Sequence, residues 1–305
     1  MALESDYLVD RRRLKRRLAL WRGLAVVIAV ALVVVAVERF KGSSVRGGDY
    51  IARLHIDSVI FNDRDRIEAL DKLVANSRAR ALILRINSPG GTVVGGEALY
   101  RALRKVADKK PVVAVMDGIA TSGGYMAAIA AGRIFAHQAS ITGSIGVLFQ
   151  TAEITELLEM IGVSVATIKS GPLKAEPSPI TKLTPEAIRA TQALVDDMFA
   201  MFVDMVADRR KMDRGRVLKL ADGRVYTGRM AVANGLVDAI GGEPEALEWL
   251  RMEKKIDQGL PVRDLRIHRD VKAWFDRLTG LARKTVLSER LTLDGLVSVW
   301  HPRIN

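Results

Sequence analysis

Short apolar runs alternate with amphipathic stretches along most of the chain. The apolar runs lie at 50–56, 81–86, 112–116 and 163–168, and the stretches with helical periodicity lie at 63–76, 95–109, 122–131 and Pro185–Arg210. Val, Ile and Leu dominate the apolar runs, as is typical of strands that a parallel sheet buries on both faces. The alternation predicts an α/β fold built from repeated β-α units.

An uncharged apolar segment, GLAVVIAVALVVVAV at Gly23–Val37, follows the basic stretch Arg11–Arg22. Counted from Leu18, it is long enough to cross the roughly 30 Å of a hydrocarbon core. A buried core helix and a cleaved secretory signal are the alternatives, but the segment lacks a clean small-x-small cleavage site. We expect an uncleaved, single-pass anchor in the cytoplasmic membrane. The positive-inside rule then keeps the N-terminus in the cytoplasm and places the remainder in the periplasm or outside.

The predicted organisation has five parts. They are a basic cytoplasmic N-terminus at 1–22, a transmembrane anchor at 23–39, a polar linker at 40–49, an α/β domain at 50–242 and an extension at 243–305. In the extension, Leu260–Ile267 reads as an edge strand. Apolar positions at helical spacing between Val271 and Leu281 favour a helix packed on a neighbour, with contact to a membrane surface as the alternative.

Charge and cysteine content narrow the function classes. The formal net charge of +12 comes mainly from the two ends, because residues 1–22 carry +4, residues 251–305 carry +5 and the long middle carries +3. Aromatic residues make up only 5% of the chain, so we expect no nucleic-acid partner. The chain has no cysteine, which excludes disulfides, a thiol nucleophile and thiolate metal ligands.

Two glycine-rich loops follow the second and third predicted strands. They are Asn87–Gly91 (NSPGG) and Asp117–Tyr125 (DGIATSGGY), and both lie where an α/β sheet forms its sites. An oxyanion formed at Ser122 could be met by the amide of Gly123 and, if the two loops meet across neighbouring strands, by that of Gly91. Ser122 could equally be a simple N-cap, with the glycines as spacers.

Several well-known motifs are absent, since the chain has no G-x-S-x-G elbow, no phosphate-binding P-loop and no H-E-x-x-H. We therefore expect no metal and no cofactor. The four histidines read as ordinary core or surface residues. The loop Lys169–Pro179 offers two lysines, and a lysine can act as a general base only when burial or a nearby positive charge keeps it neutral.

Five segments together resemble the signal peptide peptidase A (SppA) family of membrane-anchored serine proteases. In the family's order they are Asn87–Gly91, Ala120–Tyr125, Ile141–Val147, Ser170–Lys174 and Asp222–Gly228, the last leading into Gly235–Asp238. The resemblance runs from about Ile51 to Gly242 and implies a ClpP/crotonase-like protease domain at 50–242, preceded by one transmembrane helix.

The resemblance also implies a Ser-Lys dyad, with Ser122 as the nucleophile and Lys174 as the general base. It makes the amides of Gly91 and Gly123 the oxyanion donors, and it makes Ser144 the hydroxyl that orients the lysine. No cofactor takes part in such a mechanism.

One departure from the family pattern follows the lysine. The family often has an acidic residue directly after it, whereas this chain has Ala175 and then Glu176. Lys169 matches no catalytic position, so a structural role is expected for it.

The family's substrates are signal-peptide remnants and other extended hydrophobic segments at the outer face of the membrane. A single copy of the motifs implies a homo-oligomeric ring, in which the lysine of one subunit approaches the serine of its neighbour and isolated subunits are inactive. Two other function classes stay open. One is a crotonase-like acyl-CoA enzyme, which also holds an oxyanion with glycine amides, and the other is a non-catalytic membrane scaffold.

Overall fold

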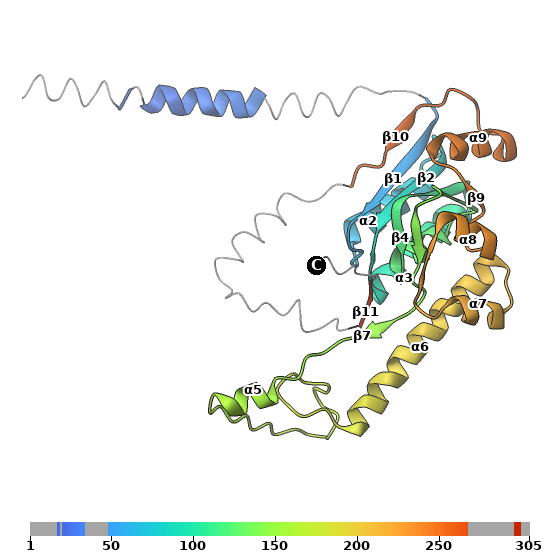
Figure 1. Cartoon of the computed structure of the whole chain (residues 1–305). Helices are drawn as coiled ribbons and strands as arrows, with labels where there is room; N and C mark the ends of the chain where they lie inside the picture. The colour runs from blue at the N-terminus through green and yellow to red at the C-terminus, as the bar shows by residue number, and fades with distance from the viewer. Residues whose placement is uncertain (1–16, 19, 34–47, 268–295, 300–305) are drawn as a thin grey trace, which may run out of the picture. The chain divides into compact units, whose positions relative to one another are not determined.

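The computed structural model describes residues 17–18, 20–33, 48–267 and 296–299, and the chain divides into two compact units, Met1–Gly48 and Asp49–Asn305 (Figure 1). In the first unit, residues 20–33 are helical. Within the described ranges, no helix combines the length and the apolar character that crossing a membrane requires. The predicted anchor at 23–39 lies partly outside the described residues, which stop at 33 and resume at 48.

The second unit follows the predicted alternation of strands and helices. Its strands are β1 (Tyr50–Asp57), β2 (Ala79–Ser88), β3 (Gly90–Thr92), β4 (Val112–Thr121), β5 (Arg133–Ala136), β6 (Ile141–Gly143), β7 (Leu148–Phe149), β8 (Val225–Thr227), β9 (Ala239–Ile240), β10 (Val262–Asp264) and β11 (Leu296–Val299). Its helices are α2 (Arg64–Ala75), α3 (Val93–Ala107), α4 (Gly123–Ala128), α5 (Thr155–Met160), α6 (Pro185–Arg210), α7 (Arg214–Leu220), α8 (Gly228–Asn234) and α9 (Glu243–Lys254).

The main sheet is mixed but mostly parallel, which confirms the predicted α/β class. Its strand order is β10-β1-β2-β4-β5-β9, and β6 pairs with the far end of β4. Every described pairing in this sheet is parallel except β6 with β8. β10 lies at the edge beside β1, as predicted for Leu260–Ile267. The predicted helix between Val271 and Leu281 lies outside the described residues.

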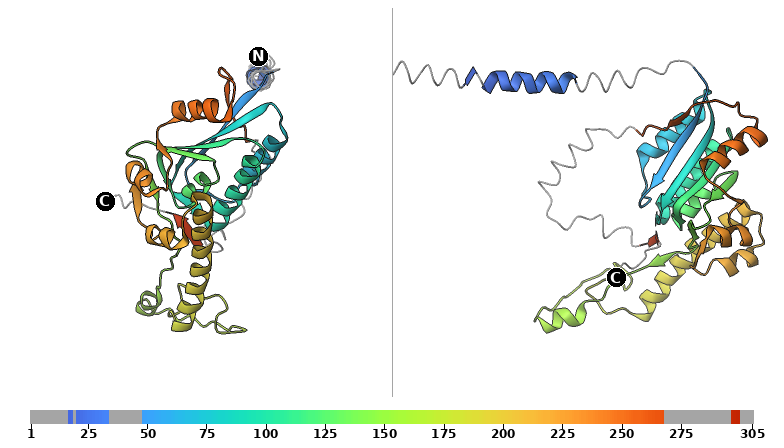
Figure 2. Two further views of the ribbon diagram at one scale, coloured as in Figure 1. Left: turned by 90° about the vertical axis from the view of Figure 1, so that its right-hand side faces the viewer. Right: turned by 45° about the horizontal axis from the view of Figure 1, so that its top comes forward.

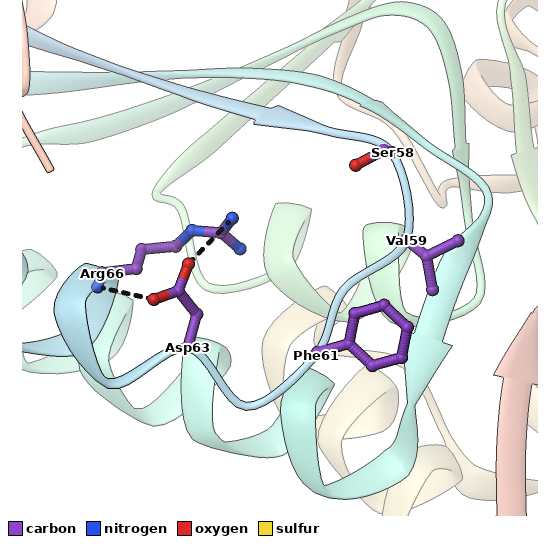
Figure 3. A pocket seen from close by; sticks show the side chains of 5 residues that line it. All are labelled: Ser58, Val59, Phe61, Asp63 and Arg66. Carbon is purple, nitrogen blue, oxygen red and sulfur yellow. Dashed lines mark hydrogen bonds and ion pairs between the residues drawn. The ribbon is translucent and has the colours of Figure 1, made fainter. Parts of the chain in front are cut away.

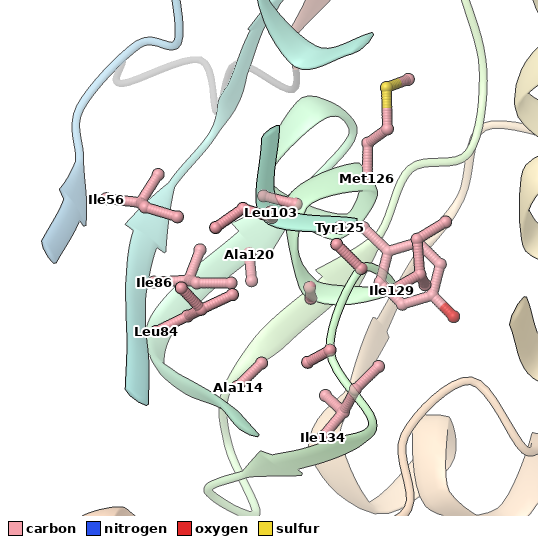
Figure 4. Packing of buried hydrophobic residues seen from close by; sticks show 14 of the residues in the cluster. Ile56, Leu84, Ile86, Leu103, Ala114, Ala120, Tyr125, Met126, Ile129 and Ile134 are labelled. Carbon is pink, nitrogen blue, oxygen red and sulfur yellow. The ribbon is translucent and has the colours of Figure 1, made fainter. Parts of the chain in front are cut away.

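Both faces of this sheet are buried, and the side chains of successive strand residues point to opposite faces. Leu82, Leu84 and Ile86 of β2 pack in a large apolar cluster with α2, α3, α4 and α6 (Figure 4). Ala81 and Ile83 alternate with them and pack toward α9 on the other face. This double burial explains why the strands read as nearly continuous apolar runs.

Side-chain caps determine where the helices around the site begin. The amide of Gly95 donates to Thr92 Oγ1 (3.1 Å) at the start of α3. At the start of α6, the amide of Ala187 donates to Thr184 Oγ1 (3.1 Å), and Pro185 occupies the first helical position. Such caps satisfy amides that have no partner within the helix.

Residues 150–184, hereafter the arm, depart from the predicted pattern. The apolar run 163–168 was expected to be a strand, and this expectation is wrong because the segment pairs with no strand among the described residues and Ile168 is fully exposed. The structure describes the whole arm, and within it the only regular element is α5, which has no buried residue. The arm extends beyond the sheet, with α5 near the N-terminal end of α6 (Figures 1 and 2).

Candidate functional site

The two glycine-rich loops meet at the carboxyl ends of β2 and β4. These strands are parallel neighbours, and Ser88 lies opposite Ala120. The hydroxyl of Thr121 donates to the carbonyl of Pro89 (3.0 Å), and the amide of Ile119 donates to Asn87 Oδ1 (3.3 Å). The condition set by the sequence, that the loops meet across neighbouring strands, is therefore fulfilled.

Ser88 fixes the shape of the first loop. Its buried hydroxyl donates to the carbonyl of Ser58 (2.6 Å) and accepts from the amide of Gly90 (3.2 Å). Gly90 has a φ of 111°, a value that favours glycine. This hydroxyl therefore binds the turn to the loop that follows β1.

Ser122 lies at the strained turn between β4 and α4. Its φ of 54° and ψ of −118° are unusual for a residue with a side chain and cost about 1–3 kcal/mol. Its amide donates to the carbonyl of Gly143 (2.9 Å), and the residue is only 1% exposed. Ser122 occupies the N-cap position of α4 but makes no side-chain cap, so the simple N-cap interpretation does not explain it.

Gly91 and Gly123 lie in close contact across the two loops. A Cβ atom at position 123 would come within 3.2 Å of the Gly91 nitrogen, and one at position 91 would lie 1.8 Å from the carbonyl oxygen of Ile60. Neither position has room for a side chain without displacing its neighbour. The backbones of Gly91 and Gly123 thus lie close together beside Ser122.

Ser144 is half-buried and follows the strand that receives the Ser122 amide. Thr121 of β4 lies opposite Gly143 of β6, so Ser144 comes directly after this pair. The amide of Ser144 donates to the carbonyl of Arg224 (2.8 Å), and the ring of Tyr226 packs over Gly143. The Asp222–Gly228 segment therefore supports the turn that carries Ser144.

A second group of contacts joins α4 to the Gly235–Asp238 segment. The hydroxyl of Tyr125 donates to the carbonyl of Leu236 (2.9 Å), and both residues are fully buried (Figure 4). Burial raises the pKa of Tyr125 well above its ordinary value, so its hydroxyl stays protonated and remains a donor. Asp238 accepts from the amide of Ile134 (2.8 Å) and pairs with Arg210 (2.7 Å). The Gly235–Asp238 motif thus anchors the helix that follows Ser122.

The two lysines of the loop Lys169–Pro179 have different surroundings. Lys169 is largely buried and forms an ion pair with Glu176, which also accepts from the Thr181 hydroxyl (3.1 Å). The hydrogen bond from Lys169 lowers the pKa of Glu176. Lys174, in contrast, is exposed. A structural role for Lys169 agrees with this pairing, whereas the amine of Lys174 is accessible.

An open cavity of about 410 Å³ lies beside the first glycine loop (Figure 3). Val59 and Phe61 line one side, and Asp63 with its ion-pair partner Arg66 lines the other. None of the residues predicted for the dyad, the oxyanion site or the orienting hydroxyl lines this cavity.

The model of peptidase family S49 matches residues 104–257, about half of the chain. The chain belongs to peptidase family S49. The Clp protease model also matches residues 62–142, the region that contains both glycine loops. This S49 member is a serine protease of the SppA type with a ClpP-like α/β fold. The family assigned from five short motifs in the sequence is therefore confirmed.

Two relatives in sequence support the same assignment of this S49 protease. A protein of Synechocystis sp. named "putative protease" is 38% identical over 75% of this chain and 83% of its own. The chloroplastic serine protease SPPA of Arabidopsis thaliana is 33% identical over 76% of this chain and 34% of its own. Among solved structures, a ClpP1 mutant from Listeria monocytogenes covers 64% of this chain and 94% of its own, with 17% identity and a TM-score of 0.41.

Four of the five residues predicted for the site of the protease lie on the glycine loops and the turn beside them. Gly91, Ser122, Gly123 and the turn that carries Ser144 lie together, whereas Lys174 lies on the arm. Sequence reasoning missed the buried hydroxyls of Ser88 and Thr121, which join the loops. It also missed β11, a strand near the C-terminus that pairs with Gly90–Thr92. The only signal for β11 was the short apolar run Leu296–Val299.

Proposed function

We propose that this S49 protease cleaves peptide bonds with Ser122 as the nucleophile, and that Lys174 of a neighbouring subunit is its general base. The observation that carries the proposal is the position of Ser122, in a strained turn beside the close contact of Gly91 and Gly123. Backbone strain of this kind collects at functional sites, where the surrounding structure holds it in place.

In the mechanism, neutral Lys174 takes the proton of Ser122 as Oγ attacks the scissile carbonyl carbon. The amides of Gly91 and Gly123 stabilise the oxyanion, and Ser144 orients the lysine. The lysine then protonates the leaving amine and activates the water that hydrolyses the acyl-enzyme. The chemistry needs no metal and no cofactor.

The arm supports delivery of the lysine by a second copy of the chain. Its apolar side chains are widely exposed, with Met160 at 82% and Ile168 at full exposure. Exposed apolar patches of this kind mark interaction surfaces. In a head-to-tail ring, the arm of one subunit covers the Ser122 region of the next and removes Lys174 from water, which favours the neutral amine that a base requires.

The proposed location is the outer face of the cytoplasmic membrane, with residues 1–22 inside, 23–39 as anchor and 40–49 as linker to the protease domain at 50–242. The uncharged stretch Gly23–Val37 and the basic residues before it support this arrangement. The substrates are signal-peptide remnants and other extended hydrophobic peptides, which emerge where the anchor holds the enzyme. Removal of residues 1–39 should release the protein from membranes.

Cleavage of a hydrophobic reporter peptide tests the dyad. Ser122→Ala and Lys174→Ala should each lower kcat/KM by at least about a thousandfold, because both groups act in the same steps. Ser178→Ala and Lys182→Ala are matched controls elsewhere on the arm and should keep most of the activity. A serine-directed acylating probe should label Ser122 alone. Unchanged cleavage by either dyad variant contradicts the assignment, and inactivity of the correctly assembled wild type favours a scaffold.

A further inference from the structure

The parallel strands β1, β2, β4, β5 and β10 all begin at one edge of the main sheet, hereafter the amino edge, and Ser122 lies at the opposite edge. Tyr50 at the start of β1 lies opposite Ala79 at the start of β2. Figure 1 shows α9 beside this end of β1, and the ring of Trp249 on α9 lies 3.9 Å from the place of a Cβ on Gly132, directly before β5. The amino edge comprises residues 48–50, 76–80, 108–111, 132–133 and 253–263.

The amino edge is basic, unlike the edge that carries Ser122. Its basic residues outnumber its acidic residues by eight to four. The basic ones are Arg78, Arg80, Lys109, Lys110, Arg133, Lys254, Lys255 and Arg263, and the acidic ones are Asp49, Asp108, Glu253 and Asp257. At the opposite edge, the segments that follow β1, β2, β4 and β5 contain one acidic residue and no lysine or arginine; they are 58–63, 89–92, 122 and 137–140. Positive charge therefore collects at one end of the strands.

Like charges crowd one another on the amino edge. Lys110 Nζ donates to the carbonyl of Asn76 (2.7 Å), which brings the ammonium group to the segment that enters β2. Burial and the positive charge of Arg80 together lower the pKa of Lys110. Asp49 offsets part of this repulsion, because it pairs with Arg80 at 3.6 Å. An anionic group bound at this edge would relieve the remainder.

Aromatic rings accompany the basic side chains. The guanidinium of Arg263 lies 4.9 Å from the ring centre of Tyr50, and the ammonium group of Lys254 lies 5.1 Å from that of Trp249. Both rings are half-buried, so each presents one part to solvent. Tyrosine and tryptophan beside lysine and arginine are typical of protein surfaces at the level of lipid headgroups.

Chain connectivity ties the amino edge to the proposed membrane anchor. The strand β1 begins at Tyr50, directly after the linker proposed at 40–49. The ten residues of this linker span at most about 36 Å even when fully extended. If residues 23–39 lie in the membrane, the amino edge is therefore the part of the domain with the shortest tether to the bilayer surface.

We propose that the amino edge binds the anionic headgroups of membrane phospholipids. The inference rests on the proposed membrane location and adds the surface with which the domain meets the bilayer. The ten residues of β4 span about 33 Å, and Ser122 follows the last of them. A domain seated on its amino edge therefore holds Ser122 well away from the headgroups. Peptides must leave the bilayer before they are cut, which selects extended segments over helices that span the membrane.

Fluorescence quenching by labelled lipid headgroups tests the inference on the full chain. The chain has no cysteine, so a single introduced cysteine can carry the fluorophore. Ser77→Cys labels the amino edge and Asn62→Cys labels the opposite edge, and both positions are exposed. In vesicles of phosphatidylcholine mixed with phosphatidylglycerol, the quencher should dim the label at 77 and leave the label at 62 unchanged. Vesicles of phosphatidylcholine alone should abolish most of this quenching, as should about 1 M salt, which screens charges beyond about 3 Å.

Charge reversal supplies matched variants. Arg78→Glu with Lys109→Glu changes two exposed positions of the amino edge, and Arg64→Glu changes an exposed position at the start of α2, beside the opposite edge. Each positive charge near an anionic surface strengthens binding about fivefold, so the double variant should weaken the contact at 77 by about a hundredfold or more. Arg64→Glu should leave the contact unchanged, and all variants should cleave a soluble reporter peptide at the wild-type rate. Equal quenching in wild type and the double variant overturns the inference.

Flotation with vesicles separates this surface from the anchor. A protein that floats with phosphatidylcholine vesicles but shows no quenching at 77 on anionic vesicles keeps the anchor and overturns the lipid contact. A protein that floats only with anionic vesicles, with quenching at 77, keeps the lipid contact and overturns the anchor. Equal quenching at 77 on neutral and anionic vesicles overturns the role of charge. A label at 77 that responds to a DNA duplex but not to anionic vesicles assigns the edge to nucleic acid instead.

Discussion

The loops that carry Ser122 and the arm that carries Lys174 differ in how completely one chain builds them. Around Ser122, buried hydroxyls join the loops, and Tyr125 holds the next helix through a buried hydrogen bond. On the arm, α5 buries no residue and Lys174 is exposed. The proposed nucleophile and oxyanion amides therefore lie in a region that one chain holds in place, while the proposed base lies on an exposed arm. Four predictions test this contrast, in order of decreasing effect.

The largest effect should follow a change at Gly91, the proposed oxyanion donor of the first glycine loop. In Gly91→Ala, the new methyl group would lie 1.8 Å from the Ile60 carbonyl oxygen, so β3 must shift and carry its amide out of position. Loss of one oxyanion donor typically lowers kcat by about 100-fold or more. Gly132→Ala is the matched control, because its methyl group finds its nearest neighbour at 3.6 Å. Steady-state kinetics on a reporter peptide measure both, and equal activities would show that the contact at Gly91 is unimportant.

A smaller loss of activity should follow a charge on the arm. Ile168→Glu leaves the fold of one chain unchanged because the side chain is fully exposed, but it should weaken assembly and lower cleavage by about tenfold. Met252→Glu places the same charge at an exposed position of α9 and should change neither property. Light scattering and the reporter assay report assembly and activity. Full assembly of Ile168→Glu would contradict the role given to the arm.

Substitution of the buried Tyr125 should lower the stability of the protein more than its activity. Tyr125→Phe leaves the buried carbonyl of Leu236 without its donor and should lower the free energy of unfolding by about 1–3 kcal/mol. Tyr50→Phe removes a hydroxyl that accepts from Asn76 in a half-buried place and should cost less. Urea denaturation compares the two variants. A larger loss of unfolding free energy in Tyr50→Phe would mean that the hydrogen bond from Tyr125 to Leu236 contributes less than its burial indicates.

The smallest expected effect concerns the pH response of the arm. Because its pKa is lowered in the folded protein, Glu176 stabilises the arm above the ordinary pKa of a glutamate. This contribution disappears as the pH falls through the lowered pKa. Protection from hydrogen exchange at residues 169–181, relative to the intrinsic rate at each pH, should therefore fall on acidification in wild type more than in Glu176→Gln. The same acid response in both proteins would show that the ion pair with Lys169 does not order the arm.

The hydrophobic pattern of the sequence correctly predicted several strands and the longest helix of the domain. The apolar runs at 50–56, 81–86 and 112–116 became strands, and Pro185–Arg210 became α6 with the predicted bounds. The run 163–168 has the same composition but no neighbouring strand, so composition alone misled there. Pairing between distant segments was also hidden, because nothing in the run Leu296–Val299 indicates that it joins Gly90–Thr92.

The predicted site shows the same difference between features that local sequence determines and features that depend on distant partners. Paired glycines and a serine after a strand were enough to place Gly91, Ser122 and Gly123, since strand ends and helix starts position them. The buried hydroxyls that join the loops could not be recognised, because Ser88 and Thr121 look like ordinary turn residues until their partners are known. The proposed approach of Lys174 to Ser122 involves a surface between subunits, which the local sequence around either residue does not specify.

Mixing two inactive variants tests the split dyad most directly. Ser122→Ala subunits keep the lysine, Lys174→Ala subunits keep the serine, and each protein alone should be inactive. If the lysine comes from a neighbour, random co-assembly at equal amounts should restore roughly a quarter of the wild-type activity, because half of the sites keep the serine and half of those meet an intact lysine. A mixture that is assembled yet as inactive as its components would contradict the account, because it would place both residues of each working site in the same chain.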